Sequence, residues 1–138
     1  MMPDKFPDSK LATAVLVLGL LWGACHPMPP PGSGDPRLPE AFCSPEKTFA
    51  TWVKATLAGD SETVRECYWE GLGKEELRAY LSQNLRPEAK TFFKDAKLVA
   101  VVAVTRVEVN FTFRSVSAQE DMVGVMVRTR HGWKVQHW

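Results

Sequence analysis

The spacing of apolar residues changes partway along the chain, and this change constrains the fold more than any other feature. Before Pro87 apolar side chains recur every three or four residues, as on one face of a helix. After Pro87 they recur every second residue, most clearly at Val107, Val109, Phe111 and Phe113, as in a half-buried strand. Because the two periods occupy separate halves, we expect an α+β fold in which N-terminal helices pack on a curved antiparallel sheet.

Three helices are expected before Pro87. The first begins with Ser44 as its cap and ends at Gly59, the second is short and ends at Gly71, and the third ends just before Pro87. The apolar stripe of the first helix is Phe49, Trp52, Val53, Thr56 and Leu57. The stripe of the third is Leu77, Tyr80, Leu81 and Leu85.

Strands are expected over residues 97–104, 107–114, 122–129 and 133–137. Short connections make them antiparallel neighbours. The first is apolar on both faces, so we expect it to be covered on both sides or to lie partly at a contact between two copies. In the last strand, Trp133 and Val135 are expected to point inward.

Residues 11–24 form a run of fourteen residues without a charge. A helix of that length spans about 21 Å, which is short of the ~30 Å hydrocarbon core of a bilayer. Lys5 and Lys10 precede the run, and the small residues Gly23 and Ala24 end it. This order is typical of an export signal, so residues 1–24 are predicted to be a signal peptide.

Cys25 follows this run directly. Residues 21–25 (LWGAC) resemble the lipobox of bacterial lipoproteins, in which the signal peptide is cut before a cysteine that receives acyl chains. Trp22 departs from the aliphatic residue that is usual at its position. The resemblance implies a lipidated Cys25, such as palmitate would supply, which would hold the chain at a membrane surface. His26, where inner-membrane lipoproteins commonly have aspartate, favours the outer membrane of a Gram-negative cell.

Residues 26–39 contain six prolines. Proline lacks a backbone donor and fixes φ, so this segment can form neither a helix nor a paired strand. We therefore interpret residues 25–39 as the lipidated cysteine and a tether, with a proline-rich ligand for an aromatic groove as the alternative. Residues 40–138 then form one domain.

Both ends of this domain resemble nuclear-transport-factor-2-like domains, which share a cystatin-like fold. The motifs are SPEK at 44–47, LAGD at 57–60 and GWKV at 132–135. The resemblance implies a cone, in which a strongly bent antiparallel sheet wraps around the first helices and an apolar pocket opens at one end. The candidates for lining that pocket are Trp52, Tyr68, Tyr80, Phe111 and Trp133.

Catalysis is not expected, although the resemblance leaves it open. Ketosteroid isomerase and scytalone dehydratase share the fold and place Asp, His or Tyr in an apolar pocket. Here Tyr68 and Tyr80 share faces with core residues, and no two titratable groups have a spacing that fits one site. His131 lies in a turn, and His137 lies next to the C-terminus.

We expect no metal, cofactor or nucleic-acid partner. The His, Cys and acidic residues show no ligand spacing, and no glycine-rich phosphate loop is present. The formal net charge is only +1, whereas a nucleic-acid binder needs a basic surplus on one face. The basic residues of the strands mostly alternate with apolar ones, as on a solvated face: Arg106, Arg114, Arg128, Arg130 and Lys134.

Cys43 and Cys67 remain once Cys25 is assigned to the lipid. An even pair in an exported chain favours a disulfide. The family resemblance implies that the two would pack side by side, and closing their loop would stabilise the fold by roughly 3–4 kcal/mol. The alternative is two independent buried thiols.

These features predict a membrane-anchored lipoprotein of the bacterial envelope with a non-catalytic binding or scaffolding domain, whose partner is a small apolar ligand or an envelope protein. One alternative is a pocket enzyme of the isomerase or dehydratase type. Another is an assembly module, in which Trp52, Phe111 and Trp133 fill the cone and the outer sheet face forms a homodimer. An empty pocket with Asp or His favours the enzyme, an empty one without them favours ligand carriage, and a filled one favours assembly.

Overall fold

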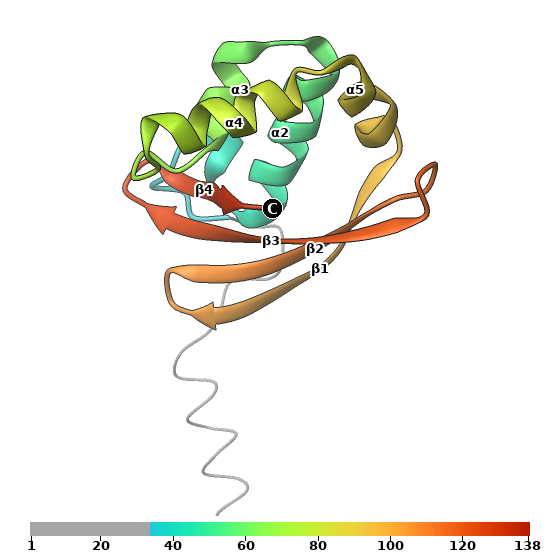
Figure 1. The fold of residues 1–138 in the computed structure, drawn as a ribbon. Coiled ribbons are helices and arrows are strands. Elements are labelled where there is room, and N and C mark those ends of the chain that lie inside the picture. The colour runs from blue at the N-terminus through green and yellow to red at the C-terminus, as the bar shows by residue number, and fades with distance from the viewer. Residues whose placement is uncertain (1–33) are drawn as a thin grey trace, which may run out of the picture. The chain divides into compact units, whose positions relative to one another are not determined.

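The computed structural model describes residues 34–138, in which helices lie along one face of an antiparallel sheet (Figure 1). The predicted signal peptide, the lipidation of Cys25 and the tether up to residue 33 lie outside the described residues. Over the described range no helix is both long enough and apolar enough to span a bilayer. The α+β class is confirmed, with strands in the order β1-β2-β3-β4.

The elements follow the expected order of helices and then strands. A short 3₁₀ turn, η1 (Glu40–Phe42), precedes the helices α2 (Pro45–Ala58), α3 (Ser61–Cys67), α4 (Lys74–Asn84) and α5 (Pro87–Phe93). The strands are β1 (Ala96–Thr105), β2 (Glu108–Ser115), β3 (Glu120–Thr129) and β4 (Gly132–His137).

The predicted limits of α2 are confirmed by its capping contacts. The Ser44 hydroxyl accepts a hydrogen bond from the Lys47 backbone N–H at 3.1 Å, which satisfies one free donor of the first turn. Gly59 ends the helix with a φ of +69°, in the left-handed region that glycine adopts without strain.

Helix α5 differs from the sequence expectation, in which the third helix ends just before Pro87 and only strands follow. Proline is also well suited to the first position of a helix, where its missing N–H is not needed. Here Pro87 begins α5, which ends with a fully buried Phe93. The ring of Phe93 lies edge-on to Trp52, with centroids 4.9 Å apart.

The space between α2 and the sheet is filled with aromatic side chains. Trp52 on α2 is fully buried, and its ring lies edge-on to Phe111 and Phe113 of β2, with centroids 6.2 and 5.7 Å away. Opposite Phe111 on β3 is Gly124, where a Cβ would lie 2.6 Å from the Phe111 ring and 2.6 Å from the His137 carbonyl oxygen. Glycine at this position therefore lets the Phe111 ring pack closely against β3.

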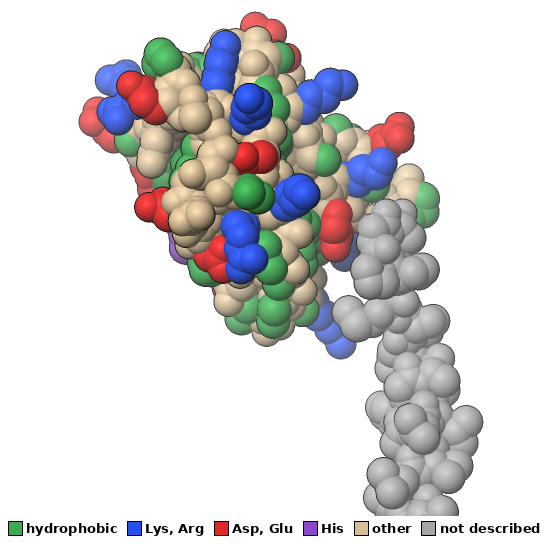
Figure 2. Space-filling view, turned by 90° about the vertical axis from the view of Figure 1, so that its right-hand side faces the viewer, with side chains coloured by type: hydrophobic (Ala, Val, Ile, Leu, Met, Phe, Trp, Pro, Cys, Tyr) green, Lys and Arg blue, Asp and Glu red, His purple; other side chains and the backbone are tan. Residues whose placement is uncertain are grey.

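Among residues 34–138, no helix lies on the other face of the sheet (Figure 1). β1 is an edge strand, and Val99, Val102 and Val104 on it are exposed, so the expected cover on both faces is absent from the described part of this single chain. Figure 2 shows hydrophobic side chains gathered at the lower end of the folded unit, where β1 and β2 lie. At the opposite edge, Val135 of β4 is buried as expected, whereas Trp133 is only half-buried.

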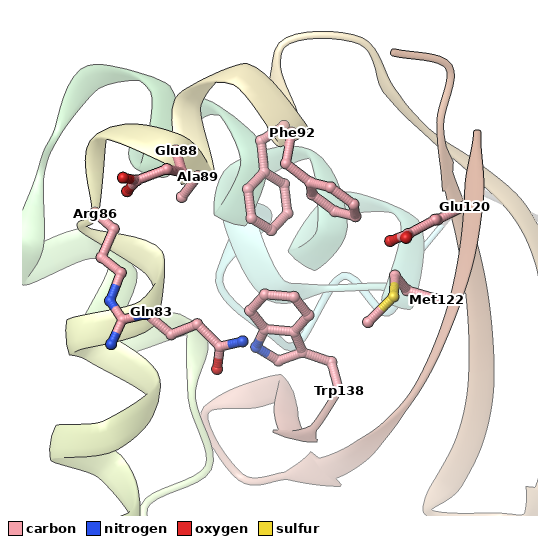
Figure 3. Close-up of a pocket in the computed structure, with 9 residues that line it drawn as sticks. Gln83, Arg86, Glu88, Ala89, Phe92, Glu120, Met122 and Trp138 are labelled. Atoms are coloured by element: carbon pink, nitrogen blue, oxygen red, sulfur yellow. The ribbon is translucent and has the colours of Figure 1, made fainter. Parts of the chain in front are cut away.

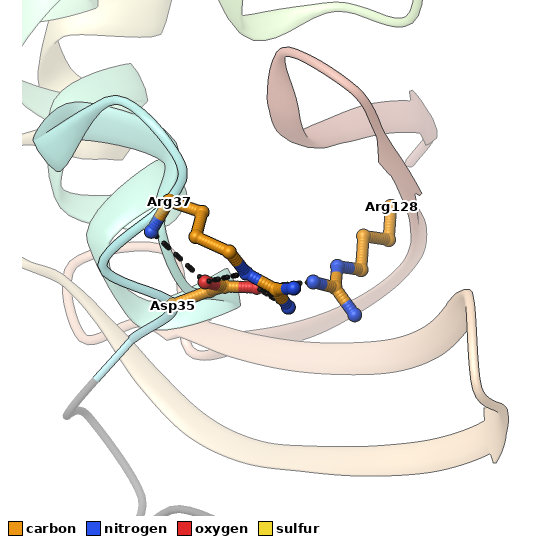
Figure 4. Close-up of polar contacts among 3 residues, drawn as sticks. All are labelled: Asp35, Arg37 and Arg128. Carbon is orange, nitrogen blue, oxygen red and sulfur yellow. Dashed lines mark hydrogen bonds and ion pairs between the residues drawn. The ribbon is translucent and has the colours of Figure 1, made fainter.

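Residues 34–39, which were predicted to end the tether, pack against the folded unit instead. The Asp35 N–H donates to the Cys43 carbonyl at 2.9 Å. The Asp35 carboxylate forms ion pairs with Arg37 and with Arg128 of β3 (Figure 4). Two proline residues in this segment do not prevent these contacts, because side chains and isolated backbone groups make them.

Candidate ligand-binding site

A pocket of about 280 Å³ opens between the α4–α5 corner and the start of β3 (Figure 3). Its lining combines an apolar part with a polar part. The apolar residues are Ala89, Phe92, Phe93, Met122 and Trp138. The polar residues are Gln83, Arg86, Glu88 and Glu120.

The core packing fixes the aromatic wall of this pocket. Phe93 stacks on Phe113 with centroids 5.9 Å apart, and Phe92 lies edge-on to Phe93 at 5.3 Å. Met122 is paired with Phe113 in the register of β2 and β3, which places it beside the same cluster. The wall is therefore an extension of the core to the open end between α5 and the sheet.

Trp138, the last residue, lies between the two sides of the pocket (Figure 3). Its indole N–H donates to the hydroxyl of Tyr68 at 2.8 Å. Its ring packs on Trp52 at 5.2 Å and on Phe93 at 5.6 Å. These contacts hold the C-terminal side chain in one orientation, as a preformed pocket requires.

A buried polar group, Asn84, links the residues behind Trp138. The donor-only indole N–H of Trp52 lies 3.1 Å from the Asn84 side chain, so the amide oxygen faces Trp52 and the amide nitrogen faces the Tyr68 hydroxyl. Burial raises the pKa of Tyr68 well above its usual range, so the hydroxyl stays protonated. Tyr68 therefore acts as a hydrogen-bonding support for Trp138 and not as a base.

The lining suits binding better than proton transfer. It contains no His, Asp, Cys, Lys or Tyr, and its two carboxylates, Glu88 and Glu120, lie on opposite sides (Figure 3). Arg86 and Gln83 offer hydrogen-bond donors. An apolar wall with a few polar groups is the usual composition of a small-molecule site, and this volume lies at the small end of the ~300–1,000 Å³ range.

None of the five pocket candidates from the sequence lines this pocket. Trp52 and Phe111 are fully buried and fill the interior that the resemblance leaves open. Tyr80 is half-buried and stacks on Tyr68, with centroids 5.2 Å apart. Trp133 is half-buried on β4, where its carbonyl accepts a hydrogen bond from Thr48 at 2.8 Å.

Tyr68 instead lines a second depression, of about 550 Å³, beside η1, α3 and β4. One cation of its lining, Lys134, is already engaged: its Nζ lies 3.5 Å from the centroid of the Phe42 ring and donates to the Glu66 carbonyl. Burial lowers the pKa of Lys134. His131 at the margin lies 3.5 Å from Glu70. Arg65 and Glu66 also line this depression, and both are exposed.

The predicted disulfide is absent, because Cys43 and Cys67 are both free thiols. Lys134 contacts the residue that precedes each cysteine, namely Phe42 and Glu66, and so bridges the two segments that the disulfide would have joined. Burial raises the pKa of Cys67 to about 12. Cys67 is therefore a protonated core residue at neutral pH, and Cys43 is half-buried.

The residues of the pocket were missed because α5 was missed. A helix that begins at Pro87 places Phe92 and Phe93 in its last turn. These two adjacent aromatic residues are the signal in the sequence that could have indicated an apolar helix end, and with it the wall of the pocket. Trp138 follows the last predicted strand, and the alternation through Trp133 and Val135 would place it on the opposite face, so only its large apolar side chain is a signal in the sequence.

Residues 34–138 contain no group of three His, Cys, Asp or Glu side chains arranged to hold a metal ion. No protein-family model matches the chain, and no curated protein matches its sequence. The argument for binding therefore rests on the geometry of the site.

Proposed function

We propose that this chain is a lipid-anchored module of the bacterial envelope that binds a small apolar ligand without catalysis. The signal peptide at 1–24 is removed, Cys25 receives acyl chains, and the folded unit presents the α5–β3 pocket. The ligand is a one- or two-ring molecule with a polar or anionic group, because the pocket is small and has Arg86 and Gln83 beside an aromatic wall.

One observation carries the binding part of the proposal: the pocket is open, mostly apolar and lacks His and Asp. An empty pocket without His or Asp favours ligand carriage, so this pocket favours a binding function over an isomerase or a dehydratase. The interior behind this pocket is filled by the fully buried Trp52 and Phe111, and by the same criterion that filling supports the assembly alternative taken up below.

The anchoring part of the proposal is supported by the sequence. An uncharged run ends at Cys25, and a proline-rich segment separates that cysteine from the folded unit. His26 favours the outer membrane if the cell is Gram-negative. We also propose a nuclear-transport-factor-2-like cone, which the helix-then-sheet order and the helices on a single sheet face support.

The pocket is tested by titrating the ¹⁵N-labelled chain with indole, benzoate and naphthoate. We expect saturable shifts of the Trp138 indole N–H for at least one of these molecules. Ala89→Phe should abolish the shifts, because Ala89 lines the pocket and a phenyl ring there would fill it. Ala79→Phe, on an exposed position of α4, is the matched control and should leave the shifts intact. Equal shifts in both variants, or none with any probe, would contradict the proposal.

A second candidate function is assembly through the outer sheet face. The exposed Val102 and Val123 on that face favour it. In this case sedimentation velocity should detect a homodimer that Val123→Glu dissociates, and Ala89→Phe should have no effect on it.

A further inference from the structure

The turn between β1 and β2 exposes two valines on either side of a basic residue. Arg106 lies between Val104, which is 51% exposed, and Val107, which is 54% exposed. Soluble proteins tolerate single exposed apolar residues. Exposed apolar side chains beside a cation combine the two contributions that bind a protein surface to an anionic membrane, namely buried apolar area and electrostatic attraction.

The chain joins the folded unit beside this turn. The Arg128 backbone N–H donates to the Val107 carbonyl at 2.7 Å. The Arg128 guanidinium pairs with Asp35, close to the first described residue (Figure 4). One residue of β3 therefore contacts both the turn and the segment that leads back to Cys25.

The length of chain between the anchor and this point is short. Ten residue steps separate Cys25 from Asp35, and a fully extended chain covers at most about 35 Å over that number of steps. A lipid on Cys25 would therefore keep the β1–β2 turn within about that distance of the bilayer. At that range the effective concentration of the membrane at the turn is high, so a weak contact suffices.

The charge around the turn is complementary to anionic lipid. Arg37, Arg106 and Arg128 outnumber the two carboxylates on the same side, those of Asp35 and Glu108.

We propose that the β1–β2 turn docks on an anionic bilayer, with Val104 and Val107 in the headgroup region and Arg106 against lipid phosphates. This inference rests on the lipid anchor of the proposed function. It specifies how the anchored module is oriented: the β1–β2 turn faces the membrane, and the outer sheet face next to it is partly covered.

The test places an environment-sensitive acrylodan label at the turn of the lipidated full chain, in vesicles of phosphatidylethanolamine and phosphatidylglycerol. The labelled variant is Val107→Cys with Cys43→Ser, since Cys67 is buried. The matched control is Val116→Cys with Cys43→Ser, because Val116 is 55% exposed at the opposite end of β2.

We expect a blue shift and loss of iodide quenching at position 107 and neither change at position 116. Arg106→Glu should reverse the shift at 107.

Three results would overturn the inference. Labels at 107 and 116 that stay equally exposed to water, on protein whose mass shows the lipid, would refute docking and leave the anchor standing. An unlipidated Cys25 by mass would refute the proposed function first and the docking with it. A blue shift at 107 in the Cys25→Ser chain without vesicles would mean that a second copy covers the turn.

Discussion

Asp35 and Arg128 are ninety-three residues apart in the chain, and their ion pair attaches the start of the folded unit to β3. Arg37 also pairs with Asp35, at 2.9 Å. The hydrogen bonds from Arg37 make the largest contribution to the low pKa of Asp35, about 2. This small network attaches residues 35–37 to the folded unit.

Acid should release this attachment. The folded pKa of Asp35 lies below the ~3.9 of an unfolded aspartate, so its stabilising contribution is complete above about pH 5 and is lost as the pH falls toward 2. An NMR titration of the Asp35 carboxyl carbon should give a midpoint near 2. Arg37→Gln should raise that midpoint toward 4, and an unchanged midpoint in this variant would contradict the assignment.

Asn84→Ala should destabilise the fold by about 2–4 kcal/mol, because the buried Trp52 N–H and Tyr68 hydroxyl lose their partner and a small cavity forms. Urea unfolding measures the difference. Asn110→Ala, on an exposed position of β2, is the matched control and should change stability by less than about 0.5 kcal/mol. Similar losses of stability in both variants would show that the buried hydrogen bonds of Asn84 do not contribute to the free energy of unfolding.

Gly124→Ala should destabilise by about 1–3 kcal/mol, since its Cβ would lie 2.6 Å from the Phe111 ring. Gly73→Ala is the comparison, because a Cβ there meets no atom within 4 Å and the backbone φ is −64°. We expect a loss of about 1 kcal/mol or less for Gly73→Ala in thermal unfolding. An equally small loss of stability in Gly124→Ala and Gly73→Ala would contradict the close packing of the Phe111 ring against β3.

The two thiols should differ in reactivity. At pH 8 the half-buried Cys43 should react with a thiol reagent in the folded protein, whereas Cys67 should react only after unfolding, because burial raises its pKa to about 12. The raised pKa also means that the contribution of Cys67 to stability is present below about pH 8 and declines as the pH rises further. Quantifying thiols with and without denaturant checks this, and an absence of thiols in denaturant would reveal a disulfide.

Much of the architecture could be predicted, because the signals are local. Ser44 and Gly59 mark the two ends of α2 by capping chemistry alone. The alternation through Phe111 and Phe113 identifies the buried face of β2. In both cases the residues that reveal the element in the sequence also make the contacts that define it: Ser44 and Gly59 cap α2, and Phe111 and Phe113 pack in the core.

The site could not be predicted, because it depends on tertiary contacts. Pro87 has two compatible roles, after a helix or at the first position of one, and only the packing of Phe93 on Trp52 decides between them. Whether Trp52 and Phe111 line a cavity or fill it depends on how closely α2 approaches the sheet. The Lys134 contacts that replace the disulfide likewise join three elements that are distant in sequence.

The most direct test of the lipid-anchored module is the mass of the chain recovered from membranes of a bacterium that expresses it. We predict a protein that has lost residues 1–24 and carries acyl chains on Cys25, and a Cys25→Ser chain that leaves the membrane fraction. A chain that keeps those residues, or an unmodified Cys25 in material that still sediments with membranes, would contradict the account.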